Sequence, residues 1–135
     1  MRVLGIDYGD KRVGIAVSDS MNIIAKGIEI WENRRDLYTK IKNIVEEYEV
    51  GTVVVGMPLN MNGSKGYRAE ITSVFVEKLK KMLREIRIVT WDERLSTRFS
   101  LKVLSETSVK RNKKKKIVDK VAATFILQGY LDSIR

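Results

Sequence analysis

Short apolar runs separated by turn residues dominate the start of the chain. Residues 2–8 are rich in apolar and β-branched side chains, and residues 13–18 form a second run after the turn at 9–12. A third run, with imperfect alternation, covers residues 24–31. Because only short connections separate these runs, we predict three strands in an antiparallel meander.

Helical spacing of the apolar positions begins after this meander. Residues 35–49 and 67–84 each carry apolar side chains three or four positions apart, which predicts two amphipathic helices. Between them, residues 52–58 form a continuously apolar run that ends at Pro58, as expected of a buried parallel strand, and residues 86–91 form another strand. This order predicts β-α-β units that extend the meander into an α/β sheet with helices on its faces.

The rest of the chain predicts a helix over 96–106, a lysine-rich loop, and a last helix that contains Asp119. With 135 residues, no internal repeat and no linker, residues 1–135 are predicted to form one domain. No apolar run approaches the roughly 18 residues of a membrane span. The start of the chain lacks the pattern of a secretory leader, so we expect a cytoplasmic protein that does not associate with membranes.

The chain is strongly basic, and much of the excess charge is local. It has 26 Lys and Arg against 17 Asp and Glu, a net charge of +9, which is typical of proteins that bind polyanions. Six basic residues lie close together with no acid among them: Lys110, Arg111, Lys113, Lys114, Lys115 and Lys116. Such a run is either a solvated loop or a segment that contacts phosphates. Its place just before the last helix favours the second interpretation.

Four carboxylates are candidates for chemistry. Asp7 ends the first strand, Asp92 and Glu93 follow the strand at 86–91, and Asp119 lies in the last helix. Because the chain contains no histidine and no cysteine, a site built from these residues has only oxygen ligands, which points to Mg²⁺ or Mn²⁺. This combination indicates metal-dependent cleavage of phosphodiester bonds.

Asp119 shares its helix face with apolar residues. At helical spacing it lies on the same side as Ala122, Ala123 and Ile126. A charge in an apolar stripe needs a partner, and such carboxylates cluster at functional sites. The alternative is that Asp119 caps the helix or pairs with a nearby lysine.

Asp7 and the Asp92–Glu93 pair both lie where strands end, which is where α/β sheets bind ligands. We expect the two strands to be adjacent and parallel, so that these acids lie side by side and a covering helix adds Asp119. Carboxylates that share one pocket repel each other unless a divalent cation neutralises them. The alternatives are an Asx turn at Asp7 and the start of a helix at Asp92.

Basic residues beside these acids are candidates for holding phosphate oxygens. They are Lys11, Arg12 and Arg94, although exposed turn charges would also explain the first two. The loop at 60–66 precedes a helix and is a candidate for presenting backbone N–H groups to an anion.

Four motifs together resemble the YqgF family of bacterial RNase H-like proteins. They are GIDYGDKRVGIAVSD at 5–19, VVGMPLNMNGSKG at 54–66, DERLST at 92–97 and KIVDKVAATFILQGYLD at 116–132. The resemblance implies a five-stranded RNase H-like fold and a Mg²⁺-dependent nuclease that matures the 5′ end of the 16S ribosomal RNA precursor. A Holliday junction resolvase is the alternative that the family offers. The resemblance also implies that Asp7, Glu93 and Asp119 are the catalytic acids and metal ligands, and it leaves Asp92 open.

One departure and two further alternatives bear on this interpretation. RuvC-type resolvases carry an acid at the end of the fourth strand, whereas residues 53–59 here read VVVGMPL, so the middle acid has to come from the next strand. The segment DYGDKRVG also resembles the first phosphate loop of actin-like and sugar-kinase ATPases, which bind nucleotide between two such domains. A non-catalytic RNA-binding assembly factor is the other alternative. Since no dimer surface is evident, we expect a monomer or weak dimer that prefers RNA precursors to branched DNA.

Overall fold

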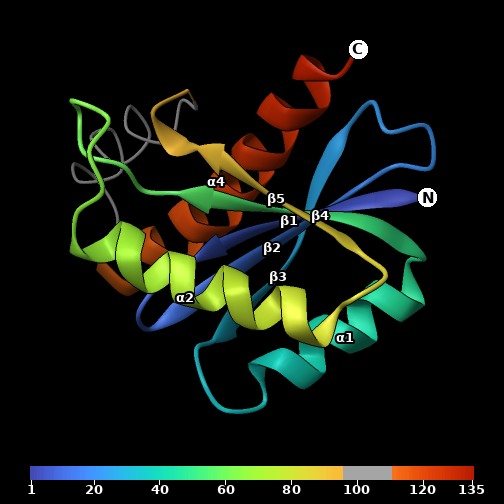
Figure 1. Ribbon diagram of the computed structural model, residues 1–135, viewed down its shortest axis with the longest axis horizontal. Coiled ribbons are helices and arrows are strands. Elements are labelled where there is room, and N and C mark those ends of the chain that lie inside the picture. The colour runs from blue at the N-terminus through green and yellow to red at the C-terminus, as the bar shows by residue number, and fades with distance from the viewer. Residues whose placement is uncertain (96–110) are drawn as a thin grey trace.

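A five-stranded mixed sheet forms the centre of the protein (Figure 1). The computed structural model describes residues 1–95 and 111–135, and the side chains of 111–120 lie outside this description. Across the sheet the strands follow the order β3-β2-β1-β4-β5. Their bounds are β1 Arg2–Tyr8, β2 Arg12–Ser18, β3 Ala25–Glu32, β4 Val50–Met57 and β5 Arg87–Asp92. Each strand begins and ends within two residues of its predicted bounds.

The pairing of the strands confirms the meander and corrects one expectation. β1, β2 and β3 pair antiparallel, and β4 is parallel to both β1 and β5. The expectation that the strands carrying Asp7 and leading to Glu93 are neighbours is wrong, because β4 lies between β1 and β5. An apolar pattern records which faces of a strand are buried, and it does not record which strand lies next to it.

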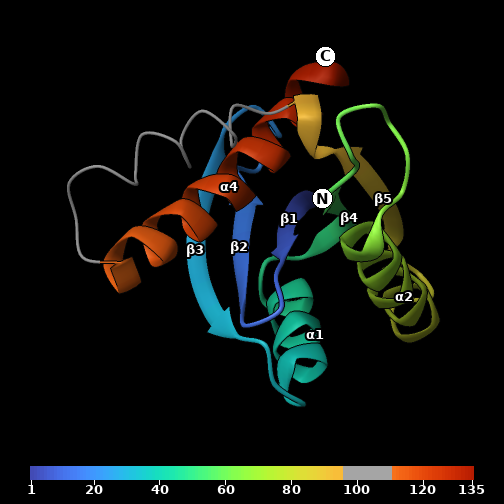
Figure 2. The same ribbon diagram turned by 90° about the vertical axis from the view of Figure 1, so that its left-hand side faces the viewer.

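Helices cover both faces of the sheet (Figure 2). The helices that the structure describes are α1 Leu37–Glu47, α2 Tyr67–Met82 and α4 Arg111–Ser133. Leu4 and Ile6 of β1 join the core under α1 and α2, whereas Val3 joins the core under α4, as the alternation of a strand requires. The helix predicted over 96–106 lies outside the described residues. Among those residues, no helix is both long and apolar enough to cross a bilayer.

α4 packs close to the sheet and is joined to the β2–β3 connection. A Cβ on Gly5 would lie 2.7 Å from the Cβ of Leu127, so only glycine allows the helix to approach β1 this closely. Further along α4, the side chain of Gln128 accepts a hydrogen bond from the N–H of Ala25 at 2.9 Å and donates one to the carbonyl oxygen of Ile23 at 2.8 Å. These contacts fix the helix over the first three strands.

The lysine run is not the loop that the sequence predicted. α4 begins at Arg111, so the backbone of Lys113–Lys116 is helical. Lysine and arginine are good helix formers, and no proline or glycine interrupts the chain between Arg111 and Gly129. The density of charge suggested a loop, while the local preference of these residues is helical.

Candidate active site at the ends of β1 and β5

Asp7 is a buried carboxylate near the end of β1. It is only 3% exposed. It follows Val3 and Gly5 at alternate positions, and these positions face α4. Burial of a carboxylate is costly unless the carboxylate is paired or coordinates a cation, so a fold that keeps one here points to a functional position.

Glu93 reaches the same side of the sheet from the end of β5. It is the first residue of η1, a 3-10 turn over Glu93–Leu95. Its carboxylate lies over Gly56 of β4, where a Cβ would be 2.6 Å from Glu93 Oε1 and 2.5 Å from Ile126 Cδ1 of α4. The side chain of Glu93 therefore occupies space between β4 and α4.

Gly56 links the two acids across the strand that separates them. β1 and β4 pair in parallel with Ile6 opposite Val55, so the next residues along, Asp7 and Gly56, lie side by side. Because Gly56 has no side chain, the space beside Asp7 on the α4 face is open to Glu93. Gly56 is not among the predicted site residues. Its signal in the sequence is a glycine inside the apolar run at 52–58, which marks a close approach of other groups.

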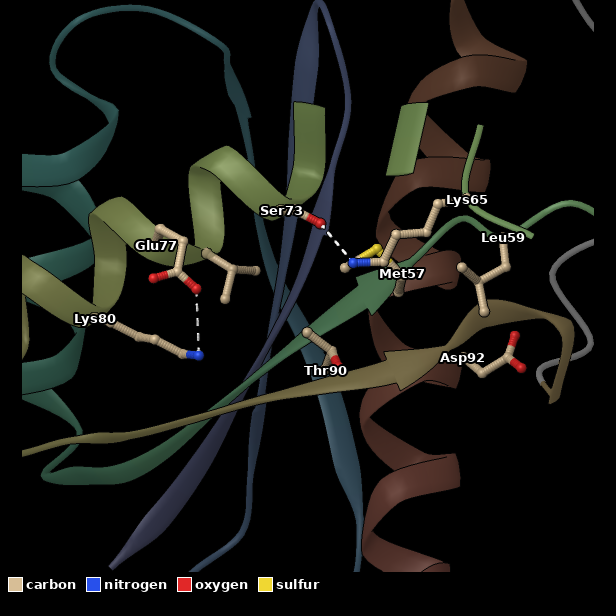
Figure 3. Close-up of a pocket in the computed structure, with 9 residues that line it drawn as sticks. Met57, Leu59, Lys65, Ser73, Glu77, Lys80, Thr90 and Asp92 are labelled. Atoms are coloured by element: carbon tan, nitrogen blue, oxygen red, sulfur yellow. Dashed lines mark hydrogen bonds and ion pairs between the residues drawn. The ribbon is translucent and has the colours of Figure 1, made fainter. Parts of the chain in front are cut away.

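Asp92 points to the opposite face of the sheet (Figure 3). With Thr90 it lines a groove beside α2. The guanidinium of Arg94 donates hydrogen bonds to both carboxylate oxygens of Asp92, at 2.6 to 3.0 Å, and the backbone N–H of Arg94 donates another at 3.0 Å. The side-chain bonds are the main reason that the pKa of Asp92 is lowered, although burial opposes this effect. Asp92 is thus an ion-pair partner of Arg94.

Arg94 also fastens the loop that follows β4. Its Nη1 donates to the carbonyl oxygen of Met61 at 3.1 Å, and a Cβ on Gly63 would lie 3.4 Å from the same nitrogen. Gly63 has a φ of +86°, a conformation that favours glycine. The loop is closed by backbone hydrogen bonds from Asn60 to Ser64 and from Gly63 to Asn60. The guanidinium of Arg94 is therefore already used within the protein, and its contact with phosphate stays a prediction.

Lys11 and Arg12 lie in and just after the turn between β1 and β2, at the same end of the sheet as the candidate acids. The N–H of Gly9 donates to the carbonyl oxygen of Arg12 at 2.9 Å and closes this turn. The neighbouring Asp10 forms an ion pair with Arg68 at the start of α2. Lys11 is exposed. The interaction of Lys11 and Arg12 with phosphate stays a prediction.

Asp119 belongs to α4, and its side chain lies outside the described residues, as do those of Lys113–Lys116. It precedes Ala123 by about one helical turn, and the carbonyl oxygen of Ala123 would lie 3.2 Å from a Cβ on Gly5. Both ribbon views show α4 running opposite to β1, so its N-terminal part lies toward the strand end that carries Asp7 (Figures 1 and 2). A role for Asp119 in the site stays a prediction.

The described donors suit a hard cation. Within residues 1–95 and the described side chains of α4, no group of three or more acids is placed to hold a metal ion. Asp7 and Glu93 are two of the three predicted ligands, and both are carboxylates, which Mg²⁺ and Mn²⁺ prefer. The chemistry of these two side chains therefore fits a divalent cation.

The chain also matches a known protein family. The chain matches the RuvX family, whose description is Holliday junction resolvase, over residues 1–133. The chain belongs to the RuvX family. This family is also called YqgF, so the resemblance carried by the four motifs is confirmed.

Relatives within the RuvX family match nearly the full length of the chain. A protein from Acetivibrio thermocellus is 48% identical, and the match covers 98% of this chain and 96% of the relative. A protein from Staphylococcus epidermidis is 49% identical, over 99% of this chain and 97% of the relative. Both are named "Putative pre-16S rRNA nuclease".

Solved structures support the fold of this RuvX-family chain. RuvC from Thermus thermophilus superposes with a TM-score of 0.59 at 10% identity, covering 99% of this chain and 96% of RuvC. The fowlpox virus resolvase in complex with Holliday junction DNA has a TM-score of 0.52 at 14% identity and covers 99% of both chains. At such low identity the likeness concerns the fold alone. It confirms the predicted five-stranded RNase H-like fold.

Proposed function

We propose that this RuvX-family protein is a metal-dependent nuclease and that it cleaves the precursor of 16S ribosomal RNA. The observation that carries the proposal is the placement of buried Asp7 and of Glu93 on one face of the sheet, on either side of Gly56. Carboxylates gathered in this way repel each other unless a cation joins them. The proposed substrate is taken from the names of the two bacterial relatives.

Asp7, Glu93 and Asp119 are the proposed catalytic acids, and the same three would hold Mg²⁺ or Mn²⁺. When bound, the cation supplies positive charge that activates water and stabilises the leaving oxygen, so a chain without histidine can hydrolyse a phosphodiester. The protein itself holds the acids in place. β1 holds Asp7, η1 directs Glu93 over Gly56, and α4 covers the face on which they meet.

Basic residues at this end of the sheet are proposed to hold the nucleic acid. Lys11 and Arg12 extend from the β1–β2 turn, Arg94 lies beside Glu93, and Lys113–Lys116 lie in the first turns of α4. Contacts of this kind position the backbone and make binding depend on salt, without reading sequence. We expect one cytoplasmic domain that acts as a monomer or weak dimer.

A cleavage assay tests the proposal. Labelled 16S precursor RNA and a labelled four-way DNA junction are each incubated with Mg²⁺, Mn²⁺ or EDTA. We expect cleavage of the RNA with either cation and none with EDTA, and Asp7→Asn protein prepared in the same way controls for contaminating nuclease. Binding of the RNA without any cleavage would replace the proposal with a non-catalytic assembly factor.

Junction resolution is the second candidate, because the family description names it. Paired cuts on two strands require a stable two-fold dimer with two facing sites. Light scattering at micromolar concentration, run beside the cleavage assay, separates the two candidates. A tight dimer that cuts junctions symmetrically and ignores RNA would establish the resolvase in place of the RNA nuclease.

A further inference from the structure

A groove lies on the sheet face opposite the candidate acids, between α2 and the edge strand β5 (Figure 3). Its volume is about 460 Å³. Met57, Leu59 and Val76 give it an apolar lining, and Ser73 and Lys80 belong to the wall that α2 forms. The groove therefore combines apolar surface with polar groups at its sides.

Two basic and two acidic side chains line the groove, and Arg94 compensates Asp92 from outside the lining, so one positive charge is left at Lys65. Lys80 lies 3.5 Å from Glu77, and Asp92 is held by the ion pair described above. Lys65 instead lies 3.4 Å from the hydroxyl of Ser73, and no salt bridge involves Lys65 in the part of the chain that the structure describes. An ammonium group beside a hydroxyl offers two donors to one anionic oxygen, which suits a phosphate.

The groove and the candidate active site lie on the two sides of the end of β5. Asp92 lines the groove, and the next residue, Glu93, lies on the other face beside Gly56. β5 is the edge of the sheet among the described strands, so one strand end separates the groove from the acids. Lys65 belongs to the loop that Arg94 ties to this same end.

We infer that this groove binds the single-stranded flank of the substrate. The phosphates of the flank lie at Lys65 and at Lys80, which exchanges its exposed contact with Glu77 for a phosphate, and its bases lie against Met57, Leu59 and Val76. Proteins hold single strands without reading their sequence through basic groups on the phosphates and side chains packed against the faces of the bases, a place that aromatic rings usually take and that Met57, Leu59 and Val76 take here. The space takes nucleotides of one strand and excludes a duplex with its two backbones. The inference rests on the proposed function, since it assumes a nucleic acid at Asp7 and Glu93.

Two RNAs test the inference. The long RNA has a single-stranded flank of about six nucleotides beyond the cleavage site, which is within the range that small single-strand sites occupy. The short RNA ends at the cleavage site. The groove variant is Lys65→Ala with Lys80→Ala. The matched control is Lys78→Ala with Lys81→Ala, which removes the same charge from exposed positions that do not line the groove. Wild type and control should show a lower KM for the long RNA than for the short one. In the groove variant this advantage should disappear while kcat for the long RNA stays the same.

Binding of the long RNA in EDTA provides a readout that does not need cleavage. Loss of two phosphate contacts should lower the slope of log affinity against log salt by roughly 1.4 in the groove variant and leave it unchanged in the control. This result without any cleavage by wild type would remove the proposed function and keep the groove as a single-strand site. Three results would each overturn the inference. The first is an equal difference in KM between the long and the short RNA in the groove variant and the control. The second is a difference that survives when the flank is made double-stranded, and the third is binding of an acidic peptide that RNA does not displace.

Discussion

The two faces of the sheet use consecutive acids at the end of β5 in different ways. On the α4 face, Glu93 extends over Gly56 toward the position of Asp7. On the α2 face, Asp92 lies in an open groove and its charge is taken up by Arg94. Strand alternation therefore separates the two roles: one step along the chain leads from an acid that organises a loop to a candidate metal ligand.

The sharpest test of this comparison is to neutralise each acid in turn. Glu93→Gln should lower the cleavage rate by roughly 10²- to 10³-fold, as loss of one transition-state-stabilising group does, and Asp7→Asn and Asp119→Asn should do the same. Asp92→Asn should lower it far less. Without metal, the free energy of unfolding of the Glu93 and Asp7 variants should stay equal or rise slightly, because repulsion between carboxylates is relieved. Single-turnover kinetics measure the cleavage rates, and denaturant unfolding measures the free energies of unfolding. Equal losses for Asp92→Asn and Glu93→Gln would abolish the distinction between the faces.

Filling the space on the α4 face should have the next largest effect. In Gly56→Ala, the new Cβ would collide with Glu93 Oε1 and Ile126 Cδ1, so we expect a loss of about 1–3 kcal/mol in stability, typical of overpacking, together with a large fall in cleavage. Gly51→Ala in the same strand is the control, because the three atoms nearest to its Cβ would all belong to the side chain of Met1, which is exposed and can move aside. If the Gly56 variant cleaves like the Gly51 variant, the space over Gly56 is not part of the site.

Releasing the ion pair on the α2 face should have a moderate effect. Arg94→Gln removes the bonds to Asp92 and Met61, so the amides of residues 59–66 should exchange hydrogen faster and cleavage should fall several-fold through poorer placement of Glu93. Stability should change by only about 0.2–1 kcal/mol, since the pair is partly exposed. Arg87→Gln at the other end of β5 is the control. Unchanged exchange in the loop would contradict the link between the loop and β5.

The smallest effect concerns pH on the face covered by α1. Burial, and then the charge of Tyr8, raise the pKa of Tyr38 above its ordinary value of 10.0. The folded protein therefore keeps this proton more tightly than the unfolded chain, so the stabilisation is complete below pH 10 and is lost as the pH rises through the raised pKa. Tyr38→Phe should show a shallower loss of stability above pH 10 in denaturant titrations. Parallel curves for the variant and wild type would disprove the shift.

Much of this arrangement follows from the sequence, and the missing parts have physical reasons. Apolar periodicity identifies the strands because burial of a face leaves a repeat in the chain. This periodicity does not show which strands lie next to each other in the sheet, so the position of β4 between the strands that carry the acids could not be predicted. Gly56 could not be assigned to the site, because a glycine in a strand signals a close approach without showing which group approaches. The role of Arg94 in binding phosphate stays a prediction, while its contacts with Asp92 and Met61 could not be predicted, because a charge in a sequence does not reveal the oxygens that the fold brings to it.

The hydrogen bonds between Gln128 and the β2–β3 connection have a consequence for synthesis. Gln128 and Ala25 are 103 positions apart, and α4 supplies the cover for strands that are made well before it. Because a chain emerges from its N-terminus onward, Val3 and Ala16 stay uncovered until α4 has been made. On the proposed function, a nascent chain has no complete site before α4 exists, so the ribosome that makes this protein is protected from its activity up to that point.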